Sequence, residues 1–536
     1  MNSEEFRKAA HSAVDEIIDY FDTIQDRRVV SSVEPGYLRK LLPSGPPAEG
    51  ETWGTIQKDI EAKIMPGLTH WQSPNFMAFF PANATYPSIL GELYSAAFTA
   101  PAFNWLCSPA VTELETVVLD WLAHILHLPD RFLSEGEGGG VIQGSASEAI
   151  VTVMVAARER YLNQACEGLE GQEREEMRND TRGRLIALGS EESHSSTAKA
   201  ALIAGVRYES ISTRMEDHLA LTGEGLRIAL DECAGQDLQP FYLTTTLGTT
   251  GTCATDNFYE IAEILRKANM STRIWVHVDA AYAGAALILD EYGHIAKHFA
   301  AFDSFNVNMH KWLLTNFDAS CLYVCTRAHL TSALSITPSY LRNRFSDSGL
   351  VTDYRDWQIP LGRRFRALKI WFVLRTYGVN GLKAHVRKHI FMGDKFAAWV
   401  RERDDLWEIV TPPAFALTVI TIAPPAQSKV ALPNGMTNPR VNEGSGTSNI
   451  LPSASKKDRV RTNTLTKDVY ERINSAGEVF LTSSVVKGIY AIRVVSANEK
   501  ADEAHLRRAF DILVDTAEMA ISESEAETGK TDRRSQ

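Results

Sequence analysis

The sequence predicts an α/β protein with a mostly parallel sheet covered by helices. Between about residues 140 and 330, strand-like runs rich in β-branched and aromatic residues alternate with helical runs. This alternation is typical of right-handed crossovers between parallel strands, with helices packed on the sheet. Beyond about residue 376 the pattern changes to helices mixed with strands, which predicts a second, smaller α+β domain.

The first expected helix of the large domain begins at Ser108, a capping residue, with Pro109 at the first helical position. The apolar residues that recur behind it at helical spacing are expected to face the core: Leu114, Val117, Val118, Trp121, Leu122, Ile125 and Leu126. Strands are expected at residues 141–143, 184–188, 241–245, 274–278, 302–308 and 488–495, and helices at 148–153 and 259–265.

Three parts are expected along the chain, because domains usually contain about 100–200 residues. Residues 1–85 form an N-terminal helical segment, 86–375 a large α/β domain, and 376–536 a small α+β domain. Within the small domain, residues 424–464 are rich in Pro, Gly, Ser, Asn and Thr and lack apolar periodicity, so we expect a disordered surface insertion. The polar tail, 523–536, is also expected to be disordered.

Composition and charge narrow the function classes. The chain has 44% hydrophobic and 23% charged residues and a formal net charge of −12, so no nucleic-acid or anionic-membrane surface is expected. No apolar stretch reaches the roughly 18 residues that span a bilayer, and the N-terminus carries acids without an apolar signal core. The six cysteines are scattered among apolar neighbours, which favours free thiols and a cytoplasmic protein. Because zinc-binding and P-loop motifs are absent, we expect no metal.

An aspartate and a lysine near the middle of the chain are the most informative pair of residues. The buried strand expected at 274–278 delivers Asp279 at its carboxyl end, and the strand at 302–308 delivers Lys311 on the loop beyond it. Enzymes that use pyridoxal phosphate need such a pair: a lysine that bonds the cofactor's aldehyde and an acid that keeps the pyridine nitrogen protonated. Taken singly, each residue is more typical of a surface lysine or a strand-end turn.

A glycine- and serine-rich turn at residues 144–148 follows the first expected strand and opens a helix. Small residues at a helix N-terminus let backbone N–H groups approach a phosphate, which the helix dipole also attracts. Beside Asp279 and Lys311, this common turn supplies the third part of a pyridoxal phosphate site. A hydroxyl-rich strand end at 246–251 is a further candidate donor. His194 follows another strand, where an imidazole either begins a helix or stacks on a flat cofactor and transfers protons.

With these motifs the chain resembles the group II pyridoxal-phosphate decarboxylases, specifically the aromatic-L-amino-acid decarboxylases. The resemblance covers about residues 1–420 and again about 465–520. It implies fold-type I, the fold of PLP-dependent transferases, and decarboxylation of an aromatic L-amino acid to the arylalkylamine and CO2. The stretches that carry it are residues 70–87, 108–121, 138–149, 247–250, 277–284, 310–314 and 347–366.

The resemblance also implies roles for individual residues. Lys311 would carry the cofactor, Asp279 would pair with its pyridine nitrogen, and His194 would stack on its ring and contact the substrate. Tyr340 matches the tyrosine of a loop that closes over the neighbouring subunit's site and delivers a proton. Family members are homodimers with both sites at the interface, and their N-terminal helices wrap around the partner. The remaining cofactor contacts would be Ala146, Ser147, Thr246, Ala281, Asn308 and His310, and the substrate ring would lie among Trp71, Phe80, Ala82, Pro101, Phe103 and Gly362.

A few positions bear on the substrate. Met309 stands where a proline is usual in the family. Ala82 stands where animal dopa-type members carry a threonine that meets the ring hydroxyl, so discrimination for a catechol is expected to weaken. Gly362 matches the glycine of plant indole-type members, although animal members also have glycine there. His310 together with Gly362 favours an aromatic over an imidazole substrate.

Two alternatives to decarboxylation remain. An aromatic aldehyde synthase on the same scaffold traps oxygen and oxidises the amine, and such relatives usually lose the loop tyrosine or the stacking histidine. Tyr340 and His194 are both present, which favours decarboxylation. A non-catalytic binding protein with the same fold is expected to lose the lysine or the acid first, yet Lys311 and Asp279 both stand.

Overall fold

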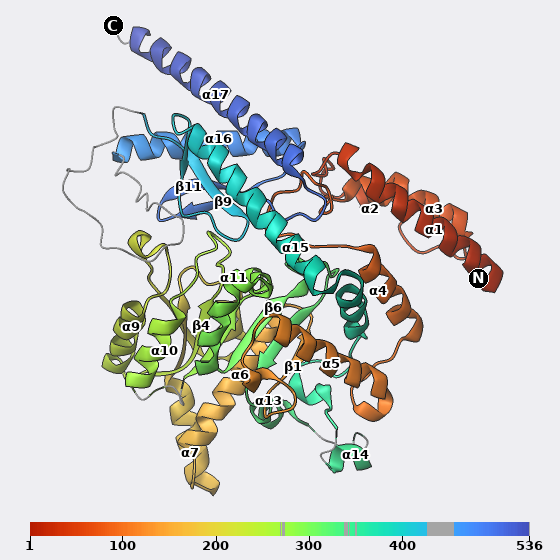
Figure 1. Ribbon diagram of the computed structural model, residues 1–536, viewed down its shortest axis with the longest axis vertical. Helices are drawn as coiled ribbons and strands as arrows, with labels where there is room; N and C mark the ends of the chain where they lie inside the picture. Colours follow the sequence, from red (N-terminus) through yellow and green to blue (C-terminus); the bar gives the residue numbers. More distant parts are fainter. Residues whose placement is uncertain are drawn as a thin grey trace.

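A computed structural model describes residues 1–268, 270, 274–336, 341, 343–348, 351–425 and 455–534. The chain forms a large α/β unit, a small α+β unit beside it and an N-terminal arm of helices (Figure 1). Tyr340 lies outside the described residues, as do 426–454 and 535–536 of the two segments expected to be disordered.

The large sheet has seven strands in the order β1-β7-β6-β5-β4-β2-β3. The strands from β2 to β6 pair in parallel, and β7 is antiparallel to both of its neighbours, β1 and β6. The prediction of a mostly parallel sheet is therefore confirmed. The bounds are β1 (Gly139–Gln143), β2 (Leu185–Ser190), β3 (Arg207–Ile211), β4 (Gln239–Thr246), β5 (Trp275–Asp279), β6 (Ser304–Asn308) and β7 (Ser320–Val324).

Helices cover both faces of the large sheet, which is why its central strands are buried throughout. Successive side chains of a strand point to opposite faces. Tyr242 and Trp275 therefore pack with α6 (Ala146–Ala165) and α8 (Ser196–Ala204). Leu243 and Val276 pack on the other side with α5 (Pro109–Ile125), α9 (Gly223–Gly235) and α10 (Phe258–Lys267). The other helices of this unit are α4 (Tyr86–Phe98), α7 (Gly171–Arg184), α11 (Asp290–Gly293), α12 (Met309–Trp312), α13 (Ala328–Leu334) and α14 (Arg344–Asp347).

The small unit is an antiparallel sheet in the order β10-β11-β9-β8, packed against three helices. A long helix, α15 (Arg366–Glu402), joins it to the large unit and is kinked at Gly378, whose φ of 62° and ψ of 173° are accessible only to glycine. The kink lies just beyond residue 375, where the sequence predicts the large domain to end. The bounds are β8 (Trp407–Ile409), β9 (Leu417–Ile422), β10 (Thr482–Val486), β11 (Ile489–Val495), α16 (Lys456–Ala476) and α17 (Glu503–Arg534).

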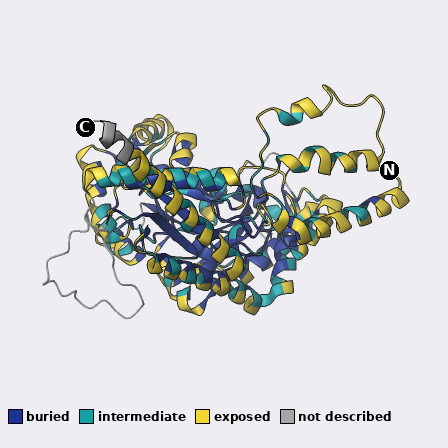
Figure 2. Cartoon of the chain, turned by 90° about the horizontal axis from the view of Figure 1, so that it is seen from above, coloured by how far each residue is buried: buried dark blue, intermediate teal, exposed yellow. Residues whose placement is uncertain are grey.

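The N-terminal arm holds α1 (Ser3–Thr23), α2 (Tyr37–Leu41) and α3 (Trp53–Asp59), which lie within residues 1–85, where the sequence predicts a helical segment. Figure 2 shows these helices as mostly exposed and extending away from the body of the chain. Among the residues of α1, only Ala9 and Phe21 are buried.

One prediction about α5 is partly wrong. Val117 and Trp121 were expected in the core, but they are 41% and 43% exposed. Val118 and Leu122 are buried as expected, and the buried face of α5 also includes Glu115 and Leu119, which were not expected there. Glu115 is buried because it pairs with Arg363, so apolar spacing alone misplaces the core face of this helix.

The two predictions of disorder are wrong for the parts that the structure describes. Residues 456–464 begin α16, and residues 523–534 belong to α17. The start of α16 buries Thr462 and Thr466, whose hydroxyls bond to main-chain groups, so a polar sequence still packs. The polar tail is held to α16 by ion pairs that link Glu523 and Glu525 to arginines of that helix.

Within the described ranges, no helix combines the length and the apolar character needed to cross a bilayer. The same residues contain no group of three or more His, Cys, Asp or Glu side chains arranged to hold a metal ion.

Candidate active site

A cavity of about 230 Å³ opens at the carboxyl ends of β4, β5 and β6. Ligands of open α/β sheets usually bind at this edge. Thr246, Asp279 and Asn308 are the last residues of these three strands, so their side chains reach the cavity together. The lining residues are Phe80, Ser145, Ala146, Ser147, His194, Thr246, Gly248, Thr250, Asp279, Ala281, Tyr282, Asn308, His310, Lys311 and Phe317.

All nine residues expected to contact the cofactor line this cavity. Asp279 is 5% exposed, and its Oδ1 accepts the Ala281 N–H at 3.0 Å, which fixes the carboxylate at the end of β5. Its neighbour on β4 is Thr246, which lies directly opposite in the parallel register. The pairing of strand ends that the sequence predicts is thus what brings the acid to the site.

Lys311 lies on α12, a single helical turn beyond β6. Asn83 binds this turn from the N-terminal side of the chain, donating its Nδ2–H to the Lys311 carbonyl at 2.8 Å and its backbone N–H to the His310 carbonyl at 3.0 Å. Burial lowers the pKa of Lys311, with the Asp279 carboxylate opposing the shift. A lowered pKa leaves more of the amine unprotonated and therefore nucleophilic.

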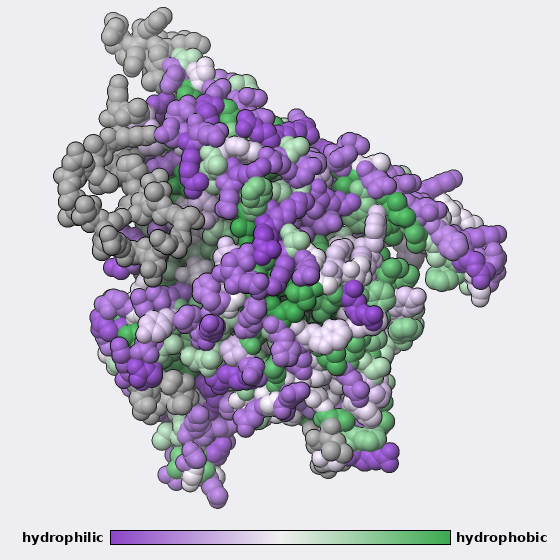
Figure 3. Space-filling model, viewed as in Figure 1, coloured by the Kyte–Doolittle hydropathy of each residue, from purple (hydrophilic) through white to green (hydrophobic). Residues whose placement is uncertain are grey.

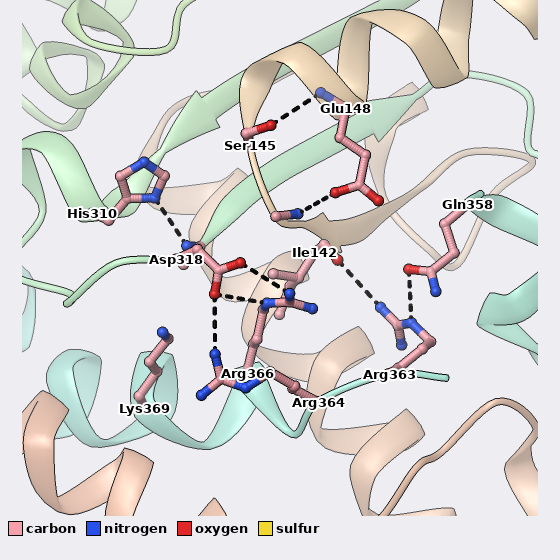
Figure 4. Close-up of polar contacts among 12 residues, drawn as sticks. Ile142, Ser145, Glu148, His310, Asp318, Gln358, Arg363, Arg364, Arg366 and Lys369 are labelled. Atoms are coloured by element: carbon pink, nitrogen blue, oxygen red, sulfur yellow. Dashed lines mark hydrogen bonds and ion pairs between the residues drawn. The ribbon is translucent and has the colours of Figure 1, made fainter. Parts of the chain in front are cut away.

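The turn before α6 is closed by its own side chains (Figure 4). Ser145 caps the helix by accepting the Glu148 N–H at 3.1 Å, and Glu148 Oε2 accepts the Gly144 N–H at 2.8 Å. A side chain at Gly144 would meet Glu148 Oε2 at 2.9 Å, so this turn favours glycine. Ala146 and Ser147 begin the helix, where backbone N–H groups have no partner within the helix. The N-terminus of α6 is therefore suited to receive an anion.

An ion network supports the cavity wall behind this turn (Figure 4). Asp318 accepts hydrogen bonds from Arg366 Nη2 at 2.9 Å and from Arg364 Nη1 at 3.4 Å. Burial raises the pKa of Asp318, but the Arg366 guanidinium outweighs it and holds that pKa below its usual range. Asp318 therefore stays ionised between Phe317 and Ala319, two residues that contact His310.

His310 is held in one neutral tautomer. Its Nδ1 accepts the Ala319 N–H at 2.9 Å, so the ring proton is on Nε2. Burial lowers the pKa of His310 to about 4. Met309 donates its N–H to the Ala319 carbonyl at 3.0 Å, a bond that a proline at this position could not make. This hydrogen bond joins the turn that carries Lys311 to the start of β7.

His194 is also neutral. Its Nδ1 accepts the Ser196 N–H at 3.1 Å and lies 2.8 Å from the Ser196 hydroxyl, which leaves the proton on Nε2. Burial lowers the pKa of His194, and Lys311 adds to the shift while Asp279 opposes it.

A column of stacked aromatic rings forms one side of the cavity. Phe80 in this column was predicted from the sequence, and Tyr282 was not. Phe80 stacks on Tyr282 with ring centroids 3.7 Å apart, and Tyr282 stacks on Trp312 at 4.7 Å. Lys311 Nζ is 5.5 Å from the centre of the Phe80 ring, and the Arg493 guanidinium is 5.3 Å from it. Tyr282 could have been predicted as a cavity residue, because it follows Asp279 by three residues in the same strand-end motif.

Of the six residues expected around the substrate ring, Phe80 alone lines the cavity of the single chain. Trp71 stacks on Phe79 at 5.6 Å and is 37% exposed, and Gly362 and Pro101 are exposed. Ala82 accepts a hydrogen bond from Gln72 through its carbonyl, and the Phe103 carbonyl accepts one from the Arg355 N–H at 3.4 Å. Their contact with a substrate stays a prediction.

The side chains present fit pyridoxal phosphate. Thr246 Oγ1 and Asn308 Oδ1 are buried at the cavity and have no hydrogen-bond partner within the described part of the chain. Such unsatisfied atoms are costly unless a ligand meets them. An acid at one strand end, a lysine at the next and an open helix N-terminus then match a basic ring nitrogen, an aldehyde and a phosphate.

Comparison with known proteins agrees with this chemistry. Residues 35–422 match the pyridoxal-dependent decarboxylase conserved domain. Tyrosine decarboxylase 2 of Narcissus pseudonarcissus is 39% identical over 528 residues, covering 98% of this chain and 96% of the relative. Phenylacetaldehyde synthase of Arabidopsis thaliana is 40% identical over 520 residues, covering 96% of each. The crystal structure of Oryza sativa TDC with PLP and tryptamine has a TM-score of 0.86 at 35% identity, covering 97% of this chain and 99% of that chain.

The chain therefore belongs to the pyridoxal-dependent decarboxylases. It is a carboxy-lyase of fold-type I whose cofactor is pyridoxal phosphate, so the predicted fold, family and cofactor are confirmed.

Proposed function

We propose that this enzyme converts an aromatic L-amino acid to the corresponding arylalkylamine and CO2. The observation that carries the proposal is the convergence of Lys311, Asp279 and His194 on one cavity beside the N-terminus of α6. When bound there, the cofactor supplies a protonated ring that absorbs the electron pair left behind as CO2 departs.

Each side chain has a task in this proposal. Lys311 would hold the cofactor through its amine, which is made more nucleophilic by burial. Asp279, fixed by the Ala281 N–H, keeps a proton on the pyridine nitrogen through its negative charge. His194, neutral and with its proton on Nε2, would stack on the cofactor ring and could pass that proton toward the reacting carbon. Tyr340, from a segment outside the described residues, is proposed to deliver the proton to that carbon.

We also propose that the enzyme is a homodimer with its sites at the interface and the N-terminal segment, 1–85, wrapped around the partner. Apolar side chains of α4 support this: Tyr86, Leu90, Leu93, Tyr94 and Phe98 are each about half exposed. Figure 3 shows hydrophobic residues gathered over the α4 and α5 region, where Trp121 and Val117 are also exposed. A second chain covering this face would bring further walls to the substrate pocket. Sedimentation of wild type and Leu93→Glu tests it: a monomer in wild type contradicts the proposal.

The same scaffold supports an aromatic aldehyde synthase, and the Arabidopsis thaliana relative bears such a name. His194 and Tyr340, both present, favour protonation over reaction with oxygen. We propose that Tyr340→Phe loses most amine formation and releases aldehyde, ammonia and peroxide instead, because general-acid help is typically worth about 10²–10⁴-fold. Unchanged amine output without aldehyde removes Tyr340 from the mechanism.

Substrate choice within the aromatic class is proposed from Ala82 and Gly362, which favour use of tryptophan at least as efficiently as dopa. The test is a panel of L-amino acids with detection of the amine product. A kcat/KM for dopa more than about tenfold above that for tryptophan, worth roughly 1.4 kcal/mol in the transition state, contradicts this preference.

A cytoplasmic location is also part of the proposal. All six cysteines are unpaired in the structure, five of them buried, as suits a reducing compartment. Fractionation of the cells that make the protein tests this, and recovery with secreted proteins contradicts it.

A further inference from the structure

The turn between β10 and β11 has an unusual residue at its first position. Val486 pairs with Ile489, so the loop contains only Lys487 and Gly488, with φ of 47° and 82°. Two-residue turns with both φ values positive favour Asn-Gly, because positive φ is costly for most side chains. The contact that its side chain makes is therefore a reason for a lysine at this position.

Lys487 reaches from the small unit to the loop that carries His194. Its ammonium forms an ion pair with the carboxylate of Glu191, three residues before His194. The same carboxylate accepts the Thr213 N–H at 2.6 Å and the Thr213 hydroxyl at 3.0 Å, and the Glu191 N–H donates to the Ile211 carbonyl at 2.9 Å. Burial opposes ionisation of Glu191, but the bonds from Lys487 and Thr213 keep its pKa below the usual range.

The turn is held from its other side by α16. Asn463 donates its Nδ2–H to the Gly488 carbonyl at 2.9 Å and accepts the Tyr490 N–H at 2.9 Å. The tip of the hairpin is thus fixed between α16 and Glu191. Its position depends on a helix turn that the sequence alone places in a disordered segment.

The neighbouring strand contacts a second loop of the cavity. Arg493 on β11 donates to the Gly251 carbonyl at 3.0 Å and to the Thr482 hydroxyl at 2.8 Å. Gly251 directly follows Thr250, which lines the cavity. The β10–β11 hairpin therefore touches both the loop before His194 and the loop after β4.

We propose that Lys487 is a positioning residue: through Glu191 it fixes the loop that holds His194 over the cofactor. The inference rests on the role of His194 in the proposed function. Both side chains of the pair are about one third exposed, at 31% and 32%. An ion pair of that exposure changes a local equilibrium by at most about fivefold, which is enough to alter how often His194 is correctly placed.

The decisive variant is Lys487→Asn. It gives the turn the sequence Asn-Gly, which this turn type prefers, and it removes the ammonium. The hairpin is therefore not weakened. Glu191→Gln removes the charge from the other side and keeps an oxygen for Thr213. Lys395→Met is the matched control, because Lys395 forms a similar ion pair with Glu503 within the small unit.

Two measurements on the holoenzyme compare these variants with the wild type. Hydrogen exchange, measured by mass spectrometry, is expected to quicken about threefold to fivefold in residues 191–197 for Lys487→Asn and Glu191→Gln, in line with an ion pair of this exposure. In decarboxylation, kcat is expected to fall by no more than the same factor, because only the open fraction of the loop is inactive, with little change in KM. The double variant is expected to lose no more than either single variant, and Lys395→Met is expected to match wild type.

Unchanged exchange of residues 191–197 in both Lys487→Asn and Glu191→Gln overturns the proposal. Faster exchange with kcat equal to wild type overturns the positioning of His194, since the loop is then freed without consequence. A wild-type protein that forms no amine refutes the proposed function instead, and the exchange experiment still decides whether Lys487 holds the loop.

Discussion

Replacing His277 with glutamine is expected to make the protein less sensitive to acid. His277 is fully buried on β5, two residues before Asp279. Trp275 Nε1 donates to the Ser304 hydroxyl at 2.7 Å, so that hydroxyl donates in turn to His277 Nδ1, 2.8 Å away. His277 Nε2 then donates to Asn306 Oδ1 at 2.8 Å. If His277 carried a proton on Nδ1, the Ser304 hydroxyl would have to accept a hydrogen bond from it. The hydroxyl's own proton would then have no acceptor in this chain of bonds.

Burial accordingly lowers the pKa of His277 from 6.5 to about 4. Because the pKa is lower in the folded than in the unfolded protein, the folded protein binds fewer protons between these values. The stabilisation is present above pH 6.5 and is lost as the pH falls toward 4. Between pH 7.5 and pH 5.0, His277 alone is expected to remove about 2 kcal/mol of the free energy of unfolding.

Urea unfolding followed by tryptophan fluorescence at pH 7.5 and 5.0 measures this effect. His277→Gln is expected to lose about 2 kcal/mol less than wild type between the two pH values, whatever its absolute stability. His124, exposed on α5, provides the matched control, and His124→Gln is expected to follow wild type. Asp256, whose pKa burial raises to about 7, acts in the opposite direction but equally in all three proteins. An equal pH dependence in wild type and His277→Gln refutes the reasoning.

Three further predictions concern the site and its supports. Lys311→Ala is expected to abolish turnover while circular dichroism stays unchanged, because Lys311 is the one lysine among the described residues that lines the cavity; turnover retained in the presence of added pyridoxal phosphate contradicts this. Glu115→Ala leaves Arg363 buried without its carboxylate and is expected to cost about 3–5 kcal/mol in urea unfolding, whereas a loss below about 1 kcal/mol contradicts a buried pair. Deleting residues 424–464 is expected to lower activity, since it removes Asn463 from the β10–β11 turn, and wild-type activity rules that support out.

The chemistry of the site was predictable because it lies at strand ends. Asp279 and Lys311 follow runs of β-branched and aromatic residues, and parallel strands bring such ends to one edge of the sheet. The glycine- and serine-rich turn before α6 was predictable as well, because it directly follows a strand. Gly248 and Thr250, which also line the cavity, lie in the hydroxyl-rich run that the sequence marked as a candidate donor.

The features that escaped prediction depend on partners far along the chain. Glu115 is buried only because Arg363, 248 residues away, neutralises it, and this polar position hides the core face of α5. Thr462 and Thr466 pack through hydroxyl bonds to main-chain groups, so apolar periodicity does not mark the start of α16. The Lys487–Glu191 pair joins two units of the fold and has no local signature.

The most direct test of the proposed function is the stoichiometry of a single reaction. The holoenzyme is incubated with a carboxyl-labelled aromatic L-amino acid, and released CO2, amine, aldehyde and consumed oxygen are measured together. One amine for each CO2, with no oxygen consumed, is the result that a decarboxylase with His194 and Tyr340 in place predicts. Aldehyde and oxygen consumption equal to the CO2 released would make the enzyme an aldehyde synthase and contradict the account.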